Sequence, residues 1–255
     1  MASQKRKVAL VTGGAKRIGA AIVRDLAAHG FAVAIHCRAS RSEANALAQD
    51  VIRIGGESAV VSADLTDMQA VDALVPQVRE ALGPVQLLVN NASLFNDDTA
   101  QDFDWDGWDA HFAVHLKAPA ALTRAMATGL PDDTQGLVVN VIDQRVWRLN
   151  PRFFSYTLSK SALWTATQTM AQAYAPRIRV NAIGPGPTLK NARQENNDFA
   201  QQIDALPLRR GPDLAEFGAT IRYLWEARSV TGQMIAIDGG QHLAWRTPDV
   251  DGVVE

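Results

Sequence analysis

Tyr156 and Lys160 lie four residues apart, a pair of side chains whose types and spacing suit proton transfer. If a helix begins near residue 154, both side chains leave the same face, one turn apart. An ammonium group beside a phenol favours the phenolate, so we expect Tyr156 to exchange its proton nearer neutral pH than a free tyrosine with a pKa of about 10. This spacing also arises by chance, so the prediction depends on the elements around the pair.

Asp143 directly follows the apolar run 136–142 and precedes the tyrosine and lysine in the chain. A buried parallel strand would place this carboxylate at its carboxyl end, where open α/β sheets carry their chemistry. An ionised carboxylate only accepts hydrogen bonds and would repel a developing alkoxide, so it suits a substrate that presents N–H groups. A carboxyl group coupled to Tyr156 could also supply a proton to an imine nitrogen, and the two groups would then titrate as a pair.

Length and composition are those of an ordinary globular enzyme. The chain has 255 residues, 47% of them hydrophobic, a formal net charge of -2 and a single cysteine, Cys37. We therefore expect one domain spanning 1–255, in the cytoplasm, with no basic surface for nucleic acid and no disulfide. No apolar run approaches the ~20 residues that cross a bilayer, so we expect no membrane partner.

Short runs rich in β-branched residues alternate with longer amphipathic runs along the chain. This alternation predicts an α/β fold: a Rossmann-type, doubly wound parallel sheet with helices on both faces. The expected strands are 8–12, 31–37, 58–62, 87–90, 136–142, 177–183 and 233–237. The expected helices are near 18–29, 41–54, 67–82, 106–128, 154–174 and 212–226.

The first expected strand runs into the glycine-rich turn 12–19, which opens the first helix. Gly13 and Gly19 allow a tight turn and a close approach of a pyrophosphate to the helix N-terminus. Arg17 stands where such turns usually carry their middle glycine, and it brings a fixed cation to the phosphates. The alternative is that these glycines serve only the geometry of a strand-to-helix connection.

The second and third expected strands end in residues that bear on the choice of cofactor. Arg38, Ser40 and Arg41 follow the second strand, and no acidic residue occurs there before Glu43, which favours a 2′-phosphate and hence NADP over NAD. The alternative is an ordinary charged surface loop. After the third strand, the Asp64 carboxylate of the pair Asp64-Leu65 could accept the adenine amino group or cap the next turn.

Three further features have both a functional and a plain structural interpretation. Small polar residues in the run 90–95 would let the backbone approach a cofactor, and Phe95 would offer a face to a flat substrate or join the core. His115 lies on the inward stripe of its helix, where a core histidine is the simpler interpretation. Pro185 and Gly186 open a polar loop, about 186–210, that we expect to cover the substrate.

These motifs together, in this order and spacing, resemble the short-chain dehydrogenase/reductase family across essentially the whole chain. Asp143 in place of the usual serine, Arg17 in place of glycine and the run 90–95 are similar to the pteridine reductase branch. His115 stands where the family usually carries an asparagine. Together with the ending 238–243, it resembles the bacterial dihydromonapterin reductases, sometimes described as alternative dihydrofolate reductases.

The resemblance implies a homotetramer that reduces a small-molecule pterin-like substrate with NADPH and needs no metal. Its implied catalytic residues are Asp143, Tyr156 and Lys160, with His115 as a possible proton relay. Its implied substrate-binding residues are Arg17, Ser93, Phe95, Asp143 and Tyr156. Its implied cofactor-binding residues are Gly13, Arg17, Ile18, Gly19, Arg38, Ser40, Asp64, Leu65, Asn91, Ala92, Ser93, Tyr156, Lys160, Pro185 and Gly186.

Two alternatives stay open from the sequence. One is an NADP-dependent carbonyl or alcohol oxidoreductase of the same family, and the other is a non-catalytic NADP-binding regulatory protein. The intact Tyr156/Lys160 pair speaks against the second, because a retired site needs neither side chain. The loop 144–154, which contains Arg145, is expected to shape the choice of substrate.

Overall fold

The computed structural model describes residues 7–190 and 195–245, and in these ranges it contains a seven-stranded sheet in the order β3-β2-β1-β4-β5-β6-β7. Every neighbouring pair of strands is parallel. The seven strands are β1 Lys7–Val11, β2 Phe31–Cys37, β3 Ser58–Ser62, β4 Val85–Asn90, β5 Gly136–Val141, β6 Ile178–Pro185 and β7 Met234–Ile237. All seven expected strands are present, with small differences at their ends.

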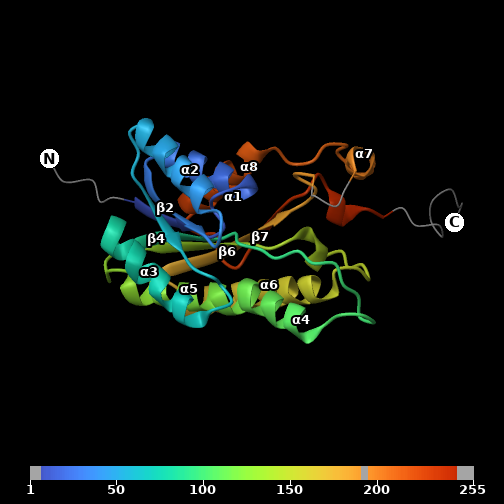
Figure 1. Ribbon diagram of the computed structural model, residues 1–255, viewed down its shortest axis with the longest axis horizontal. Coiled ribbons are helices and arrows are strands. Elements are labelled where there is room, and N and C mark those ends of the chain that lie inside the picture. The colour runs from blue at the N-terminus through green and yellow to red at the C-terminus, as the bar shows by residue number, and fades with distance from the viewer. Residues whose placement is uncertain (1–6, 191–194, 246–255) are drawn as a thin grey trace, which may run out of the picture.

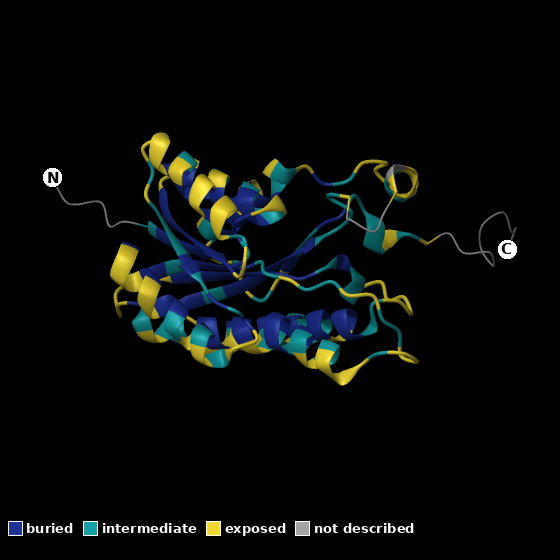
Figure 2. Cartoon of the chain, in the orientation of Figure 1, coloured by how far each residue is buried: buried dark blue, intermediate teal, exposed yellow. Residues whose placement is uncertain are grey.

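Helices cover both faces of the sheet (Figure 1). One layer holds α1 Arg17–Ala28, α2 Arg41–Arg53 and α8 Leu214–Glu226, and the other holds α3 Met68–Leu82, α4 Trp105–Phe112, α5 Ala118–Gly129 and α6 Phe154–Tyr174. Successive strand residues enter opposite cores: Ala9 and Val11 pack in one hydrophobic cluster, Val8 and Leu10 in the other. The strands are therefore buried from both sides, as Figure 2 shows, and the predicted doubly wound fold is confirmed.

Two expected elements differ from the sequence-based prediction. The helix expected over 106–128 is interrupted by a π-helical segment, Ala113–Lys117, between α4 and α5. Such segments occur often at functional sites, and this one contains His115. The loop expected over 186–210 contains a helix, α7 Asn196–Asp204, whose start is capped where the Glu195 backbone N–H donates to the Asp198 carboxylate. Residues 191–194 of that loop lie outside the described ranges.

The strand order creates a crevice at one edge of the sheet. β1 pairs with β2 on one side and with β4 on the other, so the loops after β1 and β4 leave the sheet in opposite directions. Ligands of open α/β sheets bind at such a switch point, outside the carboxyl ends of the strands. The fold thus brings the glycine-rich turn and the run 90–95 together. No helix in the part of the chain that the structure describes is long and apolar enough to span a membrane.

Candidate active site

The helix that carries Tyr156 and Lys160 starts at Phe154, as predicted from their spacing. Both side chains face the sheet and are buried, with exposed fractions of 5% and 2%. The start of the helix is held by a distant residue, Asp98. Its carboxylate accepts the backbone N–H of Ser155, and its carbonyl accepts the N–H of Phe154, each at 3.2 Å. This role could not be predicted locally, because Asp98 is one of several acidic residues in the segment 97–106.

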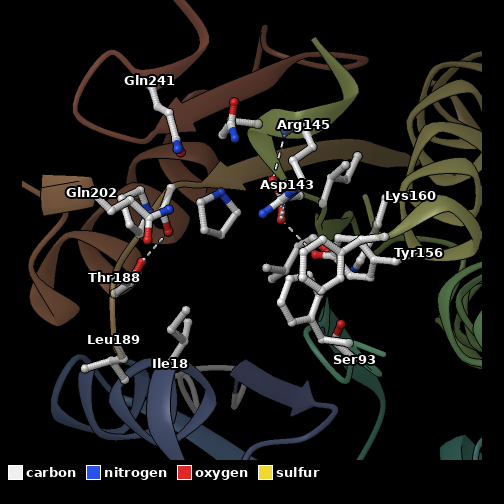
Figure 3. A pocket seen from close by; sticks show the side chains of 18 of the residues that line it. Ile18, Ser93, Asp143, Arg145, Tyr156, Lys160, Thr188, Leu189, Gln202 and Gln241 are labelled. Carbon is white, nitrogen blue, oxygen red and sulfur yellow. Dashed lines mark hydrogen bonds and ion pairs between the residues drawn. The ribbon is translucent and has the colours of Figure 1, made fainter. Parts of the chain in front are cut away.

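Asp143 and Tyr156 are brought together at the carboxyl end of β5, as expected (Figure 3). The Tyr156 hydroxyl donates a hydrogen bond to Asp143 Oδ2 at 2.9 Å. The other carboxylate oxygen, Oδ1, accepts the backbone N–H of Arg145 at 2.9 Å. A carboxylate and a phenol thus share one hydrogen bond inside a cavity, the arrangement that suits a shared, transferable proton.

The expected lowering of the Tyr156 pKa by Lys160 is wrong for this structure. Burial, together with the charge of Asp143, raises the pKa of Tyr156 well above its ordinary value. Burial also raises the pKa of Asp143, against the pull of Arg145. The lysine acts weakly because its Nζ donates to the Val141 carbonyl at 2.7 Å and lies 5.7 Å from the centroid of the Tyr156 ring. Burial lowers the pKa of Lys160 itself to about 8.

His115 connects the run after β4 to the helix α6. The backbone N–H of Leu94 donates to its Nε2 at 3.1 Å, and the Ser93 hydroxyl lies 3.0 Å from the same atom. Its Nδ1 lies 2.8 Å from the Ser159 hydroxyl, which donates to the Tyr156 carbonyl. These contacts assign the ring proton to Nδ1, and burial lowers the pKa of His115 well below its ordinary value. The histidine is thus a satisfied neutral core residue, and its relay role stays a prediction.

An aromatic wall borders the Asp143/Tyr156 pair. The ring of Phe95 meets Tyr156 edge-on, with centroids 4.8 Å apart, and stacks on Phe153 at 4.2 Å. Phe153 is the N-cap residue of α6 and has a φ of 57°, a left-handed backbone that a bulky residue adopts at a cost. A flat substrate ring stacked on Phe95 would take the face opposite Phe153 or displace Phe153. The sequence contained no signal for this second ring.

A cavity of about 700 Å³ opens in front of these groups. Thr188, Leu189, Gln202 and Gln241 lie across it from Asp143 and Tyr156 (Figure 3). Arg17 extends to this far side, where its guanidinium donates to the carbonyls of Leu189 and Lys190. The predicted site residues that line the cavity are Arg17, Ile18, Asn91, Ser93, Phe95, Asp143, Tyr156, Lys160, Pro185 and Gly186.

A second cavity, of about 460 Å³, lies over the carboxyl ends of β1 and β2. It shares four lining residues with the first cavity, so the two form a continuous path along the edge of the sheet. The remaining predicted cofactor residues all line this second cavity: Gly13, Gly19, Arg38, Ser40, Asp64, Leu65 and Ala92. The two cavities together therefore contain every residue predicted to hold the cofactor.

The turn between the two cavities has the features of a phosphate site. Gly13 has a φ of 60°, and a Cβ at Gly19 would lie 2.2 Å from the Gly13 carbonyl oxygen, so the turn needs both glycines. The N-cap residue of α1, Lys16, makes no side-chain cap, which leaves the first N–H groups of the helix for an anion. His36, which the sequence did not single out, accepts the Gly13 N–H at 3.1 Å and holds the turn on β2.

The residues at the end of the second cavity are paired at the surface. Arg38 lies 3.8 Å from the Asp64 carboxylate, with exposed side-chain fractions of 60% and 44%. Asp64 also accepts hydrogen bonds from the backbone and the hydroxyl of Thr66, so it caps its own turn. Arg38 and Ser40, the residues predicted to take a 2′-phosphate, both line this end. Across the described ranges, no cluster of three or more His, Cys, Asp or Glu side chains is placed to hold a metal ion.

Comparisons with known proteins agree with this geometry. Residues 7–201 match the family model described as short chain dehydrogenase. The chain is 61% identical to a FolM alternative dihydrofolate reductase 1 from Brucella canis, solved in complex with NADP, with a TM-score of 0.94 over 96% of this chain and 97% of that one. It is 33% identical to a short chain dehydrogenase from Burkholderia cenocepacia, also solved with NADP, with a TM-score of 0.86 over 93% and 98% of the two chains. It is 29% identical to a 3-oxoacyl-acyl-carrier-protein reductase from Synechocystis over 94% and 98%.

Proposed function

Because this chain belongs to the short-chain dehydrogenase family, we propose that it transfers a hydride from NADPH to a C=N bond of a dihydropterin or a dihydrofolate-like substrate. The coarser activity, that of an NADP-dependent oxidoreductase, follows from the family and from the solved relatives that hold NADP. The observation that carries the substrate assignment is the hydrogen bond from Tyr156 to Asp143 in the first cavity.

The carboxylate of Asp143 favours a nitrogen heterocycle over a ketone. A ketone gains negative charge on its oxygen when hydride arrives, and a neighbouring carboxylate would oppose that charge. The 2-amino-pyrimidinone ring of a pterin instead presents N–H donors, which a carboxylate accepts. The 61% identity to a FolM alternative dihydrofolate reductase supports the same class of substrate.

The residues around the two cavities fit the cofactor. We assign the pyrophosphate to the turn that contains Gly13 and Gly19, and the 2′-phosphate to Arg38 and Ser40. Bound NADPH supplies the hydride and nothing else to the chemistry. Lys160 would hold the nicotinamide ribose, and it keeps a positive charge beside the pair of acids.

The protein's own contribution is to hold and deliver one proton. The raised pKa of Tyr156 keeps its hydroxyl protonated at neutral pH, and the Asp143 carboxylate orients that hydroxyl through the 2.9 Å hydrogen bond. When hydride reaches the carbon of the C=N bond, the adjacent nitrogen becomes basic and takes the proton from this pair. Arg17, Ser93 and Phe95 line the same cavity and would position the ring.

A second candidate is reduction of a carbonyl group. It is favoured by the likeness to the 3-oxoacyl-acyl-carrier-protein reductase from Synechocystis. In that case a serine at position 143, whose hydroxyl donates to a carbonyl oxygen, would serve better than the aspartate present here.

The test is oxidation of NADPH, followed by absorbance, with dihydropterins, dihydrofolate and small ketones, for the wild type and Asp143→Ser. We expect the wild type to reduce a dihydropterin or dihydrofolate, and Asp143→Ser to lose at least 100-fold in kcat/KM on it, about 3 kcal/mol of transition-state stabilisation. A wild type that reduces only ketones, or a serine variant that gains ketone reduction while the ring substrates stay inert, would favour the second candidate.

We further propose a cytoplasmic homotetramer that associates through the outer face of α6. Small side chains allow the close approach of two helices, and two of them, Thr169 and Ala173, are exposed rather than packed on the sheet. Leu163 and Thr167 are the buried residues here: Leu163 packs with Ala182 of β6, and the Thr167 hydroxyl accepts a hydrogen bond from Asn140 of β5. The outer face of α6 is thus available to a second copy of the chain.

A further inference from the structure

Arg145 lies beside the Asp143/Tyr156 pair, although it is outside the residues assigned to the chemistry. Its Nε lies 3.9 Å from Asp143 Oδ2, the oxygen that accepts the tyrosine hydroxyl. Its backbone N–H donates to the other oxygen of the same carboxylate. Both side chains of this ion pair are 19% exposed, so water screens the attraction far less than at the surface.

The stacked pair Phe95–Phe153 holds the guanidinium in place. The Arg145 Cζ lies 4.8 Å from the centroid of the Phe153 ring and 5.7 Å from that of Phe95. Arginine packs on aromatic rings through its planar, weakly hydrated guanidinium, which an ammonium group does less well. The aromatic wall therefore holds the guanidinium beside Asp143, and the left-handed backbone of Phe153 places its ring for this contact.

Other charged groups also lie around the pair. The Nζ of Lys160, on α6, donates to the Val141 carbonyl, and its charge also lowers the pKa of Asp143. Arg17, on α1, donates to the loop carbonyls across the cavity. Arg152 pairs with Asp97 at 2.9 Å. Asp198, on α7, lines the opposite side of the cavity. The rings of His115 and of His111, on α4, lie 5.4 Å and 6.0 Å from that of Tyr156, and burial lowers the pKa of both histidines.

We propose that Arg145 is a positioning residue that sets the pH range over which the Asp143/Tyr156 pair holds its transferable proton. The proposal rests on the proposed function only in that it takes this pair as the proton donor. Arg145 contacts no reacting atom in this assignment, and it acts through Asp143.

The sign of the effect follows from the charge. A positive group favours the ionised forms of both acids, and Arg145 lowers the pKa of Asp143 and of Tyr156 against the opposing effect of burial. Removal of the guanidinium charge therefore raises both pKa values. The acid-side rise of the pH–rate profile, which follows the ionisation of Asp143, then moves to higher pH, a shift that simple loss of substrate binding does not produce.

The first experiment measures the pH dependence of kcat with NADPH and a dihydropterin for Arg145→Met, Arg145→Lys and the matched control Arg152→Met. We expect the acid-side midpoint, that of Asp143, to rise by about one pH unit in Arg145→Met, because an opposite charge within about 4–6 Å shifts a pKa by 1–3 units. Arg145→Lys keeps the charge but stacks less well on the two rings, so its acid-side midpoint should lie between those of the wild type and Arg145→Met. Arg152→Met, which removes a cation from the same Phe153 ring but not from Asp143, keeps the wild-type midpoints whatever its rate. Unchanged midpoints in Arg145→Met would overturn the proposal.

A second readout needs no turnover. Carboxyl ¹³C NMR of protein labelled at the aspartate carboxyl carbon, with Asp143→Asn to assign the resonance, follows the titration of Asp143 in the wild type and in Arg145→Met. We expect the Asp143 midpoint to rise in Arg145→Met. If it rises while no dihydropterin is reduced, the proposed function is wrong and the role of Arg145 stands. If it does not move in a folded variant, the role of Arg145 is refuted even where the enzyme is active.

Discussion

The two ends of the long crevice handle charge in opposite ways. At the β5–α6 end, Asp143, Tyr156 and Lys160 are withdrawn from water, and the pKa of each is displaced from its ordinary value. At the β1–β3 end, Arg38 and Asp64 form an open ion pair at 3.8 Å, with exposed fractions of 60% and 44%. The β5–α6 end changes the proton affinity of its side chains, whereas the β1–β3 end presents exposed charges that a ligand can contact.

Solvent accounts for the difference. Burial destabilises the charged form of an acid or base, so the few groups in contact with it determine its pKa. Catalytic acids and bases depend on pKa values that are adjusted in this way. Exposed ion pairs are screened by water and salt and contribute little by themselves. A phosphate can therefore replace or join such a pair at small cost. Substitutions at the buried end should consequently have large, pH-dependent effects, and those at the open end small, salt-dependent ones.

The largest effect is expected at the phenol. Tyr156→Phe removes the hydroxyl that donates to Asp143 and should lower kcat by about 10²–10⁴-fold, the usual contribution of a positioned acid. The dissociation constant of NADPH, measured by fluorescence titration, should change less than about tenfold. Tyr223→Phe, at an exposed position on α8, is the matched control. If the kcat of Tyr156→Phe stays within tenfold of the wild-type value, Tyr156 is not the proton donor.

The next effect is on stability, at Lys160. Its folded-state pKa, about 8, lies below its ordinary value of 10.5, so the unfolded chain binds this proton more tightly and the wild type gains stability as pH rises between these values. Relative to Lys160→Met, the free energy of unfolding of the wild type should increase by about 3 kcal/mol between pH 7 and 10.5, since one pKa unit corresponds to about 1.4 kcal/mol. Urea denaturation of the cofactor-free proteins measures it. Lys117→Met, at an exposed lysine, should show no such trend.

The smallest effect is expected at the open end. Arg38→Ala should raise the KM for NADPH about tenfold at low salt, the value of one charged contact of about 1.4 kcal/mol, and leave the KM for NADH unchanged. The difference should shrink as salt is added, because Arg38 is exposed. Arg53→Ala, which removes an exposed arginine paired with Asp50, is the control. Equal weakening of NADPH and NADH would contradict the assignment of the 2′-phosphate to this end.

Much of the site was visible in the sequence because its parts lie next to strand ends. Gly13 and Gly19 were predicted to form a tight turn, because a short-range pattern directly after an apolar strand specifies both the turn and its place in the sheet, and the structure contains this turn. Its use as a phosphate site stays a prediction. Asp143 and Tyr156 were predicted to meet for the same reason: one ends a strand, and the other begins the helix that returns over it. The second cavity contains Arg38 and Ser40, as their position after the second strand predicts.

The contacts that depend on distant segments could not be predicted in this way. Asp98 caps α6 from 57 positions upstream, and no local pattern distinguishes it from the other acids of its segment. The stack of Phe153 on Phe95 depends on a left-handed backbone at a phenylalanine, which residue preference argues against. The π-helical segment around His115 interrupts a run whose hydrophobic period predicted a continuous helix.

The amino-acid sequence alone determined the alternating strands and helices, the glycine-rich turn and the pairing of a phenol with a carboxylate, since these follow from backbone periodicity and from the types of the side chains. Only the tertiary structure decided how strongly each of those groups holds its proton. Lys160 was expected to lower the pKa of Tyr156, but burial and Asp143 raise it, and Arg145 opposes them. Proton affinity depends on the solvent and charge around a group in three dimensions, and these are fixed only when distant parts of the chain have packed together.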